Sequence, residues 1–528
     1  MRDFQTPGRS IVYASNGLCA TSHPLAAATA VDVLKGGGNA VDAGVAAAFL
    51  LGICEPAMTG AAGDCFAIYA PPQGGLIGMN ASGRAPAAAD AGALRDKHGA
   101  AIDRRSADAV TVPGAVAGLC QLVEDHGRRG REAALAPAIR YADEGVPVAP
   151  RAAFDWRIAM ENLQGSARQH YGKNDGPYAA GDLFRLPGMA EVFRRIAAEG
   201  AKGFYEGEVA EDMVAALQAA GGVHTLDDFA GVKADYVDTI STTYKGHELI
   251  ELPPNGQGPA ALLMLDMLAQ FDLTDLDPLG VDRAHLEAEA AKLAYDARNR
   301  FVSEPASMGD GLERMLDPEL AGRLAARIDR GRALSLSETE VIGAAEHKET
   351  VYLCVVDGDG GALSLIYSIF DSFGSGLASE KFGLLFHNRG AGFNLHAGHR
   401  NEIGPGKRPM HTIIPAMLRM NGSAVMPFGV MGGQYQAAGH ARLITNLLDF
   451  EMDLQTAIDA PRIFPQDGRL RVEHTLSPVV LEGLSGLGHD LEYVETPIGG
   501  AQAIWIDADR GVLMGASDPR KDGCALGY

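Results

Sequence analysis

The stretch from Glu349 to Asp357 constrains the fold of this chain more strongly than any other. Residues 350–356 are rich in β-branched and aromatic types, and a glycine-rich turn, Asp357-Gly-Asp-Gly-Gly361, follows them. A second strand-like run then extends over residues 362–369. Two such runs joined by a glycine-rich turn predict an antiparallel hairpin. The first strand of this hairpin opens on Thr350.

The chemistry available to Thr350 depends on the bond that precedes it. Within an intact chain its hydroxyl is a weak nucleophile. Cleavage between Glu349 and Thr350 would give the residue a free α-amine, with a pKa of about 7.7 to 8.0, beside its own hydroxyl. One residue would then hold both a nucleophile and its base. A threonine that opens a strand is usually structural, so this hypothesis depends on the motifs around it.

The composition excludes several classes of partner. The net charge is -22, and the basic residues form no run longer than Arg128-Arg-Gly-Arg131, which argues against nucleic acid and anionic membranes. Six cysteines occur without a CxxC pair, so neither a disulfide framework nor a zinc site is indicated. The longest apolar stretch, 45–54, is too short to span a bilayer. We expect a cytoplasmic protein that uses no metal and no organic cofactor.

Helical and strand-like periodicities alternate along the chain before residue 349. Pro24 and Asn39 stand where a first-turn proline and a helix cap are favourable. The expected helices cover 24–34, 40–51, 211–220, 259–270 and 282–300, and the expected strands cover 61–69, 76–80, 235–243 and 249–252.

Further motifs follow the hairpin in a characteristic order. They are Tyr367-Ser-Ile369, Phe373-Gly-Ser-Gly376, Gly406-Lys-Arg-Pro409 and Gly432-Gly433. Together with Thr350 to Asp357 they resemble the small subunit of γ-glutamyltransferases, which are autoprocessing N-terminal-nucleophile hydrolases. The resemblance extends to Gly37-Gly-Asn-Ala-Val-Asp-Ala43 and to Gly515-Ala-Ser-Asp-Pro-Arg520, and so covers nearly the whole chain.

The resemblance implies both a fold and a division of the chain. The fold is α+β, a four-layer αββα sandwich in which two antiparallel sheets lie between helices. Residues 1–349 would form the large subunit and residues 350–528 the small subunit, interwoven in one catalytic domain. A homodimer of this processed heterodimer is left open.

The resemblance also assigns roles to individual residues. Thr350 would be the nucleophile released by cleavage after Glu349, and Ser368 would supply a second hydroxyl to it. Gly432 and Gly433 would place backbone N–H groups against the oxyanion, since glycine allows close approach.

The substrate pocket departs from the pattern of true γ-glutamyltransferases. Their ammonium-binding asparagine, acidic or amide residue, and aspartate correspond here to Phe370, Arg389 and Gly392, and their paired serines to His411 and Thr412. An ammonium beside Arg389 would be repelled, whereas a carboxylate would be held by Arg389 and His411. The family's carboxylate-binding arginine corresponds most closely to Arg84, displaced by two positions.

These observations predict a threonine amidohydrolase that acts on a small amide with a carboxylate-bearing acyl group. Oxamate-like and glutaryl-like amides meet this description, and the variant motifs resemble the oxamate amidohydrolase and acylase side of the family. Transfer of the acyl group to an amine instead of water stays open. One alternative is a γ-glutamyltransferase or glutathione hydrolase. A second alternative is an uncleaved binding protein without catalysis.

Overall fold

The expected hairpin lies at the centre of an antiparallel sheet. The computed structural model describes residues 8–335 and 350–528. In the described chain this sheet has seven strands, in the order β19 (Cys524–Gly527), β2 (Leu18–Thr21), β10 (Val351–Val356), β11 (Ala362–Ser368), β3 (Asp64–Ala70), β4 (Ile77–Ala81) and β7 (Asp235–Val237). The hairpin strands β10 and β11 therefore pair with β2 and β3, which precede them by about 300 residues.

A second antiparallel sheet packs face to face against the first. Its described strands run in the order β1 (Val12–Ala14), β18 (Val512–Ser517), β17 (Gly500–Asp507), β13 (Ser423–Met431), β12 (Ala416–Met420), β9 (His247–Glu251) and β8 (Ile240–Tyr244). The core between the sheets includes Phe66, Tyr352, Ile366 and Met431. Both sheets thus combine strands from before and after residue 350.

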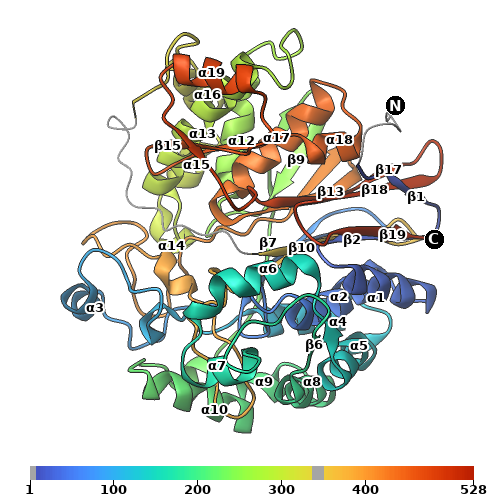
Figure 1. Ribbon diagram of the computed structural model, residues 1–528, viewed down its shortest axis with the longest axis vertical. Helices are drawn as coiled ribbons and strands as arrows, with labels where there is room; N and C mark the ends of the chain where they lie inside the picture. Colours follow the sequence, from blue (N-terminus) through green and yellow to red (C-terminus); the bar gives the residue numbers. More distant parts are fainter. Residues whose placement is uncertain (1–7, 336–349) are drawn as a thin grey trace.

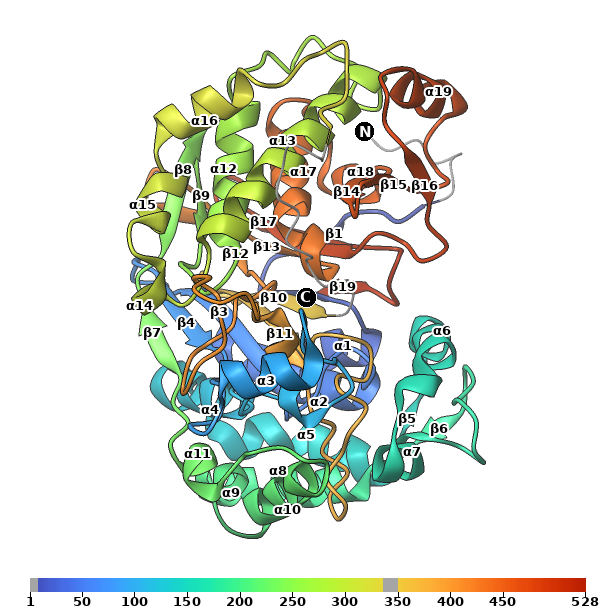
Figure 2. The same cartoon turned by 90° about the vertical axis from the view of Figure 1, so that its left-hand side faces the viewer.

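Helices cover the outer face of each sheet, which gives the expected four-layer αββα arrangement (Figure 1). The helices on the side of the β10 sheet are α1 (Pro24–Lys35), α2 (Ala40–Cys54), α4 (Ala115–His126), α5 (Gly130–Glu144), α8 (Pro187–Glu199) and α10 (Gly207–Ala219). Those on the side of the β13 sheet are α12 (Gly258–Leu268), α13 (Val281–Phe301), α16 (Pro318–Ala325), α17 (Gln436–Leu448) and α18 (Leu454–Asp459). Figure 2 shows the same stacking from the side.

The described chain contains further α-helices and β-strands. They are α3 (Ala91–His98), α6 (Pro150–Ala159), α7 (Gly165–Tyr171), α9 (Lys202–Tyr205), α11 (Leu226–Ala230), α14 (Pro305–Met308), α15 (Gly311–Met315), α19 (Pro478–Gly486), β5 (Val146–Pro147), β6 (Leu183–Phe184), β14 (Ile463–Gln466), β15 (Arg469–Val472) and β16 (Leu491–Tyr493). Within residues 8–335 and 350–528, no helix has both the length and the apolar character that a membrane span requires.

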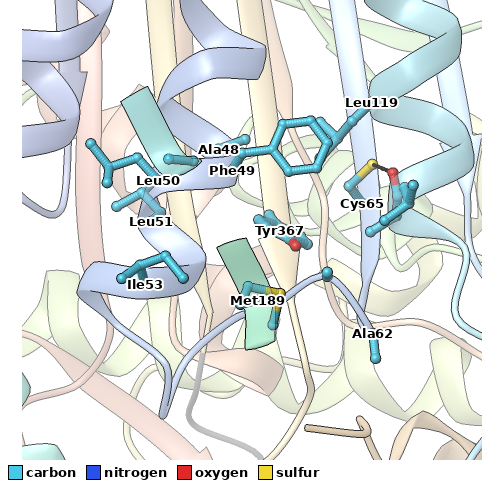
Figure 3. Close-up of a cluster of buried hydrophobic side chains, with 14 of the residues drawn as sticks. Ala48, Phe49, Leu50, Leu51, Ile53, Ala62, Cys65, Leu119, Met189 and Tyr367 are labelled. Carbon is cyan, nitrogen blue, oxygen red and sulfur yellow. Dashed lines mark hydrogen bonds between the residues drawn. The ribbon is translucent and has the colours of Figure 1, made fainter. Parts of the chain in front are cut away.

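Helix α2 packs against the sheet that contains the hairpin. Asn39 caps the helix by accepting hydrogen bonds from the N–H groups of Val41 and Asp42, while Asp42 accepts one from the N–H of Asn39. All residues of α2 are buried. In Figure 3, Tyr367 of β11 lies between side chains of α2, such as Phe49 and Leu51, and the side chains of Cys65 and Met189. Tyr367 points toward the helical layer. Because side chains alternate along a strand, its neighbours Ile366 and Ser368 point toward the other sheet.

The strand expected over residues 235–243 is instead two strands. Residues 235–237 form β7 in the first sheet, and residues 240–244 form β8 in the second. The chain crosses between the layers at Asp238 and Thr239. One continuous strand-like pattern in the sequence therefore forms two strands that belong to different sheets.

Candidate active site

Three polar residues form a row across neighbouring strands at one end of the first sheet. Val351 pairs with Tyr367, so Thr350, the preceding residue, lies opposite Ser368, and Ser368 in turn pairs with Asp64. Their side chains share the face of Tyr352 and Ile366, which belong to the core between the sheets. The hydroxyl oxygens of Thr350 and Ser368 lie 3.4 Å apart, and all three polar residues are buried.

A buried guanidinium lies beside this row. The short 3-10 helix Arg389–Gly392 places Arg389 so that its Nη2 donates to Ser368 Oγ at 3.4 Å and its Nη1 donates to Thr412 Oγ1 at 2.9 Å. The guanidinium also stacks 4.1 Å from the centre of the Phe370 ring. Burial lowers the pKa of Arg389 to about 9, so the side chain is still a cation at neutral pH.

Asp64 lies among Arg389, His387 and His411. One of its carboxylate oxygens lies 3.9 Å from Arg389 Nε, 3.1 Å from His411 Nε2 and 3.2 Å from His387 Nδ1. The backbone N–H groups of Gly83 and Gly114 donate to the other oxygen. Burial raises the pKa of Asp64, but His387 and His411 outweigh burial and hold it well below its usual range. Asp64 is therefore an anion that compensates the charge of Arg389.

His411 faces Asp64 through one ring nitrogen and the backbone through the other. The N–H of Ile413 donates to His411 Nδ1 at 3.4 Å, so Nε2 carries the hydrogen and donates to Asp64. Burial lowers the pKa of His411 to about 3, and the charge of Arg389 acts in the same direction. His411 is consequently a neutral donor to Asp64. This placement suits a residue that orients Asp64 better than one that holds a substrate carboxylate directly.

The Gly432-Gly433 turn ends β13 and leads into α17 close to Thr350. Gly432 has a φ of 110°, and a Cβ atom there would stand 2.6 Å from the Cα of Gly499. Glycine is thus required by both backbone conformation and space. The first residue of α17, Gln436, donates from Nε2 to Thr350 Oγ1 at 3.5 Å and accepts from the N–H of Ile414.

The structure brings most of the expected site residues together and places one elsewhere. Thr350, Ser368, Arg389 and Thr412 form a connected chain of contacts, with Phe370 stacked on Arg389. Arg84 is 46% exposed, lies 2.5 Å from Glu304 and donates to the carbonyl of Gly406 at 3.0 Å. Arg84 therefore participates in a surface ion pair. Glu349, the expected cleavage residue, lies outside the described residues.

Sequence patterns did not reveal Asp64, His387 or Gln436. A signal for Asp64 existed, because it is an acidic residue within an expected strand whose other residues are largely apolar. Acidic side chains are rarely buried without a partner, so such a position indicates a buried polar cluster. His387 and Gln436 lie outside regular patterns that could have identified them.

Among the described residues, one group has the side-chain types of a metal site. It consists of His285, Glu289 and His489, whose ligand atoms lie within 4.8 Å of one another. His285 Nδ1 and His489 Nε2 are 2.8 Å apart, and Lys292 Nζ donates to Glu289 at 2.6 Å. Because these groups already bond one another, we interpret them as a polar network between α13 and the segment after α19 rather than a cofactor site.

Comparison with known proteins gives a consistent assignment over the whole chain. A family profile described as gamma-glutamyltranspeptidase matches residues 26–528. The chain is 33% identical to the glutathione hydrolase-like YwrD proenzyme of Bacillus subtilis, over 98% of this chain and 99% of the relative. It is 32% identical to the oxamate amidohydrolase proenzyme of Klebsiella pneumoniae, over 97% and 99%.

A solved structure supports the fold. The crystal structure of cephalosporin acylase from Bacillus halodurans superimposes with a TM-score of 0.93 and 36% identity, covering 100% of this chain and 99% of that one. The αββα sandwich and the family predicted from the motifs are thereby confirmed. The chain belongs to the gamma-glutamyltranspeptidase family, whose autoprocessed amidohydrolases share this N-terminal-nucleophile fold.

Proposed function

We propose that this protein is an autoprocessing threonine amidohydrolase that hydrolyses a short amide whose acyl group carries a carboxylate. Thr350 is the nucleophile, and Arg389 binds the carboxylate. One observation carries the proposal. The buried guanidinium of Arg389 contacts the hydroxyl of Ser368, which in turn contacts the hydroxyl of Thr350. A fixed guanidinium in a desolvated site selects an anionic group and holds it in a defined direction.

Maturation uses the Thr350 hydroxyl within the chain. It attacks the carbonyl of Glu349, the acyl group shifts from nitrogen to oxygen, and water hydrolyses the resulting ester. The products are residues 1–349 and 350–528, the second beginning with a free amine on Thr350. The two pieces stay together, since both sheets contain strands from each of them.

Turnover uses the same hydroxyl with the new amine as its base. The hydroxyl attacks the substrate amide, and the N–H groups of the Gly432-Gly433 turn stabilise the oxyanion. The amine product leaves, and water then hydrolyses the ester on Thr350. Ser368 lies close enough to hold the hydroxyl of Thr350 in position throughout.

The geometry favours an oxamate-like acyl group over a glutaryl-like one. Two successive contacts of 3.4 Å join Thr350 Oγ1 to Arg389 Nη2, so these atoms lie no more than 6.8 Å apart. An attacked carbon stands about 3 to 3.5 Å from the hydroxyl, and a carboxylate oxygen stands about 2.7 to 2.9 Å from a guanidinium nitrogen. A carboxylate bonded directly to the amide carbon spans this short distance with both contacts made, whereas three added methylenes make the acyl group longer than the span requires. Similarity to an oxamate amidohydrolase supports the same choice.

A γ-glutamyl substrate fits this site less well. Its ammonium needs an anion, and the two carboxylates described nearest to Phe370 and Arg389 are engaged by protein groups. Asp64 faces Arg389 and two histidines. Asp371 accepts two hydrogen bonds from Arg104 and one from Asn388.

The test combines mass spectrometry with substrate comparison. Denaturing mass spectrometry of purified protein is expected to show two fragments, the smaller beginning at Thr350, and Thr350→Ala is expected to stay uncut and inactive. Release of ammonia from oxamate should exceed amine release from glutaryl and γ-glutamyl amides at equal concentration. Preference for the γ-glutamyl amide would overturn the substrate assignment. A parent chain that remains whole and inactive would instead indicate a binding protein.

A further inference from the structure

The backbone carbonyls of the Gly432-Gly433 turn are held by hydrogen bonds that also fix its N–H groups. Gly432 O accepts from the N–H of Tyr435 at 3.1 Å, and Gly433 O accepts from the N–H of Gln436 and from Gln257 Nε2, the latter at 3.0 Å. A trans peptide is planar, and its N–H points opposite to its C=O. The carbonyl of Gly432 therefore sets the direction of the Gly433 N–H, and the carbonyl of Gly433 sets that of the Gln434 N–H.

Gln257 joins this turn to the segment that contacts Arg389. It is fully buried, directly before α12, and its Nε2 also donates to the carbonyl of Thr412 at 2.7 Å. The hydroxyl of the same Thr412 accepts from Arg389. One side-chain amide therefore holds both the oxyanion turn and the segment beside the acyl-binding cation.

Arg298 fixes the orientation of that amide. Its Nη1 donates to Gln257 Oε1 at 2.7 Å and also to Gln434 Oε1, while its Nη2 donates to Asn299 Oδ1 at 2.7 Å. The guanidinium lies 4.5 Å from the centre of the Tyr295 ring. Burial lowers the pKa of Arg298 to about 10, which leaves it a cation at neutral pH. A cationic donor accepts no hydrogen bond, so the amide of Gln257 can face it only with its oxygen.

We propose that Gln257, oriented by Arg298, is a positioning residue that holds the carbonyl of Gly433 and thereby fixes the turn whose Gly432 and Gly433 N–H groups stabilise the oxyanion. This inference rests on the proposed function, because it assumes that Thr350 attacks beside this turn. Preorganised donors lower the barrier of a step that develops charge without strengthening ground-state binding in proportion. Loss of the Gln257 donors should therefore reduce kcat and leave KM nearly unchanged.

The decisive variant is Gln257→Glu. The carboxylate has the shape of the amide and still accepts from Arg298, but it cannot donate to the carbonyls of Gly433 and Thr412. We expect kcat per mature enzyme, measured by ammonia release from oxamate, to fall about tenfold or more, with KM within about threefold of the parent. Because a buried charge can also hinder folding, Gln257→Met supplies a neutral variant without a donor, and we expect the same result.

Gln455→Glu is the matched control. Gln455 is also buried, and its amide donates to Ser517 O at 2.9 Å and to Asp459 Oδ1 at 2.8 Å, outside the active site. We expect it to keep the parental kcat. Parental kcat in both variants at position 257, or an equal loss in Gln455→Glu, would overturn the inference.

Thr350→Ala separates this inference from the proposed function. If Thr350→Ala hydrolyses oxamate, the proposed function fails and the inference fails with it. If Thr350→Ala is inactive while the variants at Gln257 are unaffected, only the inference fails.

Discussion

Thr350 and Ser368 face each other across two antiparallel strands, with their hydroxyl oxygens 3.4 Å apart at the end of the β10–β11 hairpin. The same Ser368 oxygen accepts from the N–H of Phe370 at 2.9 Å and from Arg389 at 3.4 Å. Ser368 thus connects the proposed nucleophile to the proposed carboxylate-binding cation, and four predictions follow from this arrangement and its surroundings.

The first prediction concerns the hydroxyl of Ser368. Ser368→Ala leaves the donors of Phe370 and Arg389 without their acceptor, at a cost of about 1 to 3 kcal/mol. Because these donors position the groups around Thr350, we expect a similar rise in the activation barrier, so that kcat for oxamate falls about ten- to one-hundred-fold. Ser368→Thr retains the hydroxyl and should keep most of the activity. Steady-state kinetics on enzyme whose cleavage has been verified by mass spectrometry provide the measurement, and equal rates for both variants would contradict the role.

The second prediction concerns the geometry of Arg389. Arg389→Lys keeps a positive charge near Asp64 but loses the planar fork that holds a carboxylate. A lost charge-assisted contact is worth about 1.5 to 3 kcal/mol, so KM for oxamate should rise about ten- to one-hundred-fold.

Arg151→Lys is the control for this change. Arg151 Nε donates to both carboxylate oxygens of Asp155, at 2.8 and 2.9 Å, on helix α6. The KM of the Arg151→Lys variant for oxamate should equal that of the parent. A parental KM in Arg389→Lys would remove Arg389 from substrate binding.

The third prediction concerns acid stability and His411. Its pKa is about 3 in the folded protein and about 6.5 when unfolded, so the unfolded chain binds the extra proton between these values. Stability supplied by neutral His411 is therefore complete above pH 6.5 and lost as the pH falls. At about 1.36 kcal/mol per pH unit, His411 accounts for up to about 2 kcal/mol of the loss between pH 7 and pH 5.

Chemical denaturation at pH 7 and pH 5 tests this. His411→Gln is less stable than the parent at pH 7 but should lose less stability on acidification. For each protein we compare the free energy of unfolding at pH 7 with that at pH 5. A destabilisation that is the same at both pH values therefore cancels. The prediction fails if the parent and His411→Gln lose the same free energy of unfolding.

The fourth prediction concerns the close approach of Gly432 and Gly499. Gly432→Ala combines a positive φ with a Cβ atom 2.6 Å from the Cα of Gly499, so the backbone of the turn must move. We expect self-cleavage and amide hydrolysis to fall together, because both steps build an oxyanion beside this turn.

Gly468→Ala isolates the effect of backbone strain. Gly468 has a φ of 81°, but a Cβ atom there meets no atom within 4 Å. Gly468→Ala should lower the free energy of unfolding by roughly 1 to 2 kcal/mol and leave self-cleavage and kcat unchanged. Normal cleavage and hydrolysis in Gly432→Ala would show that the turn does not support the oxyanion.

Local patterns in the sequence determined the elements around the site. The β-branched run after Thr350 and its glycine-rich turn produced β10 and β11 close to their expected bounds, and Asn39 capped α2 at the expected residue. These features depend on neighbouring residues and backbone preferences, which a sequence contains directly. The order of the motifs then identified the family and predicted roles for Thr350, Ser368 and Arg389.

The tertiary structure alone decided which distant groups meet. Asp64 reaches Ser368 only through the register between β3 and β11, and a shift of one residue would turn Asp64 to the opposite face. In the assembled fold His411 lies against Asp64, and Arg84 forms a surface ion pair with Glu304. Gln257 lies directly before α12 and Arg298 lies within α13, neither in a catalytic motif, and only packing of the α12 and α13 layer brings them to the Gly432-Gly433 turn. Pairing across hundreds of residues depends on the assembled core, and no local pattern records it.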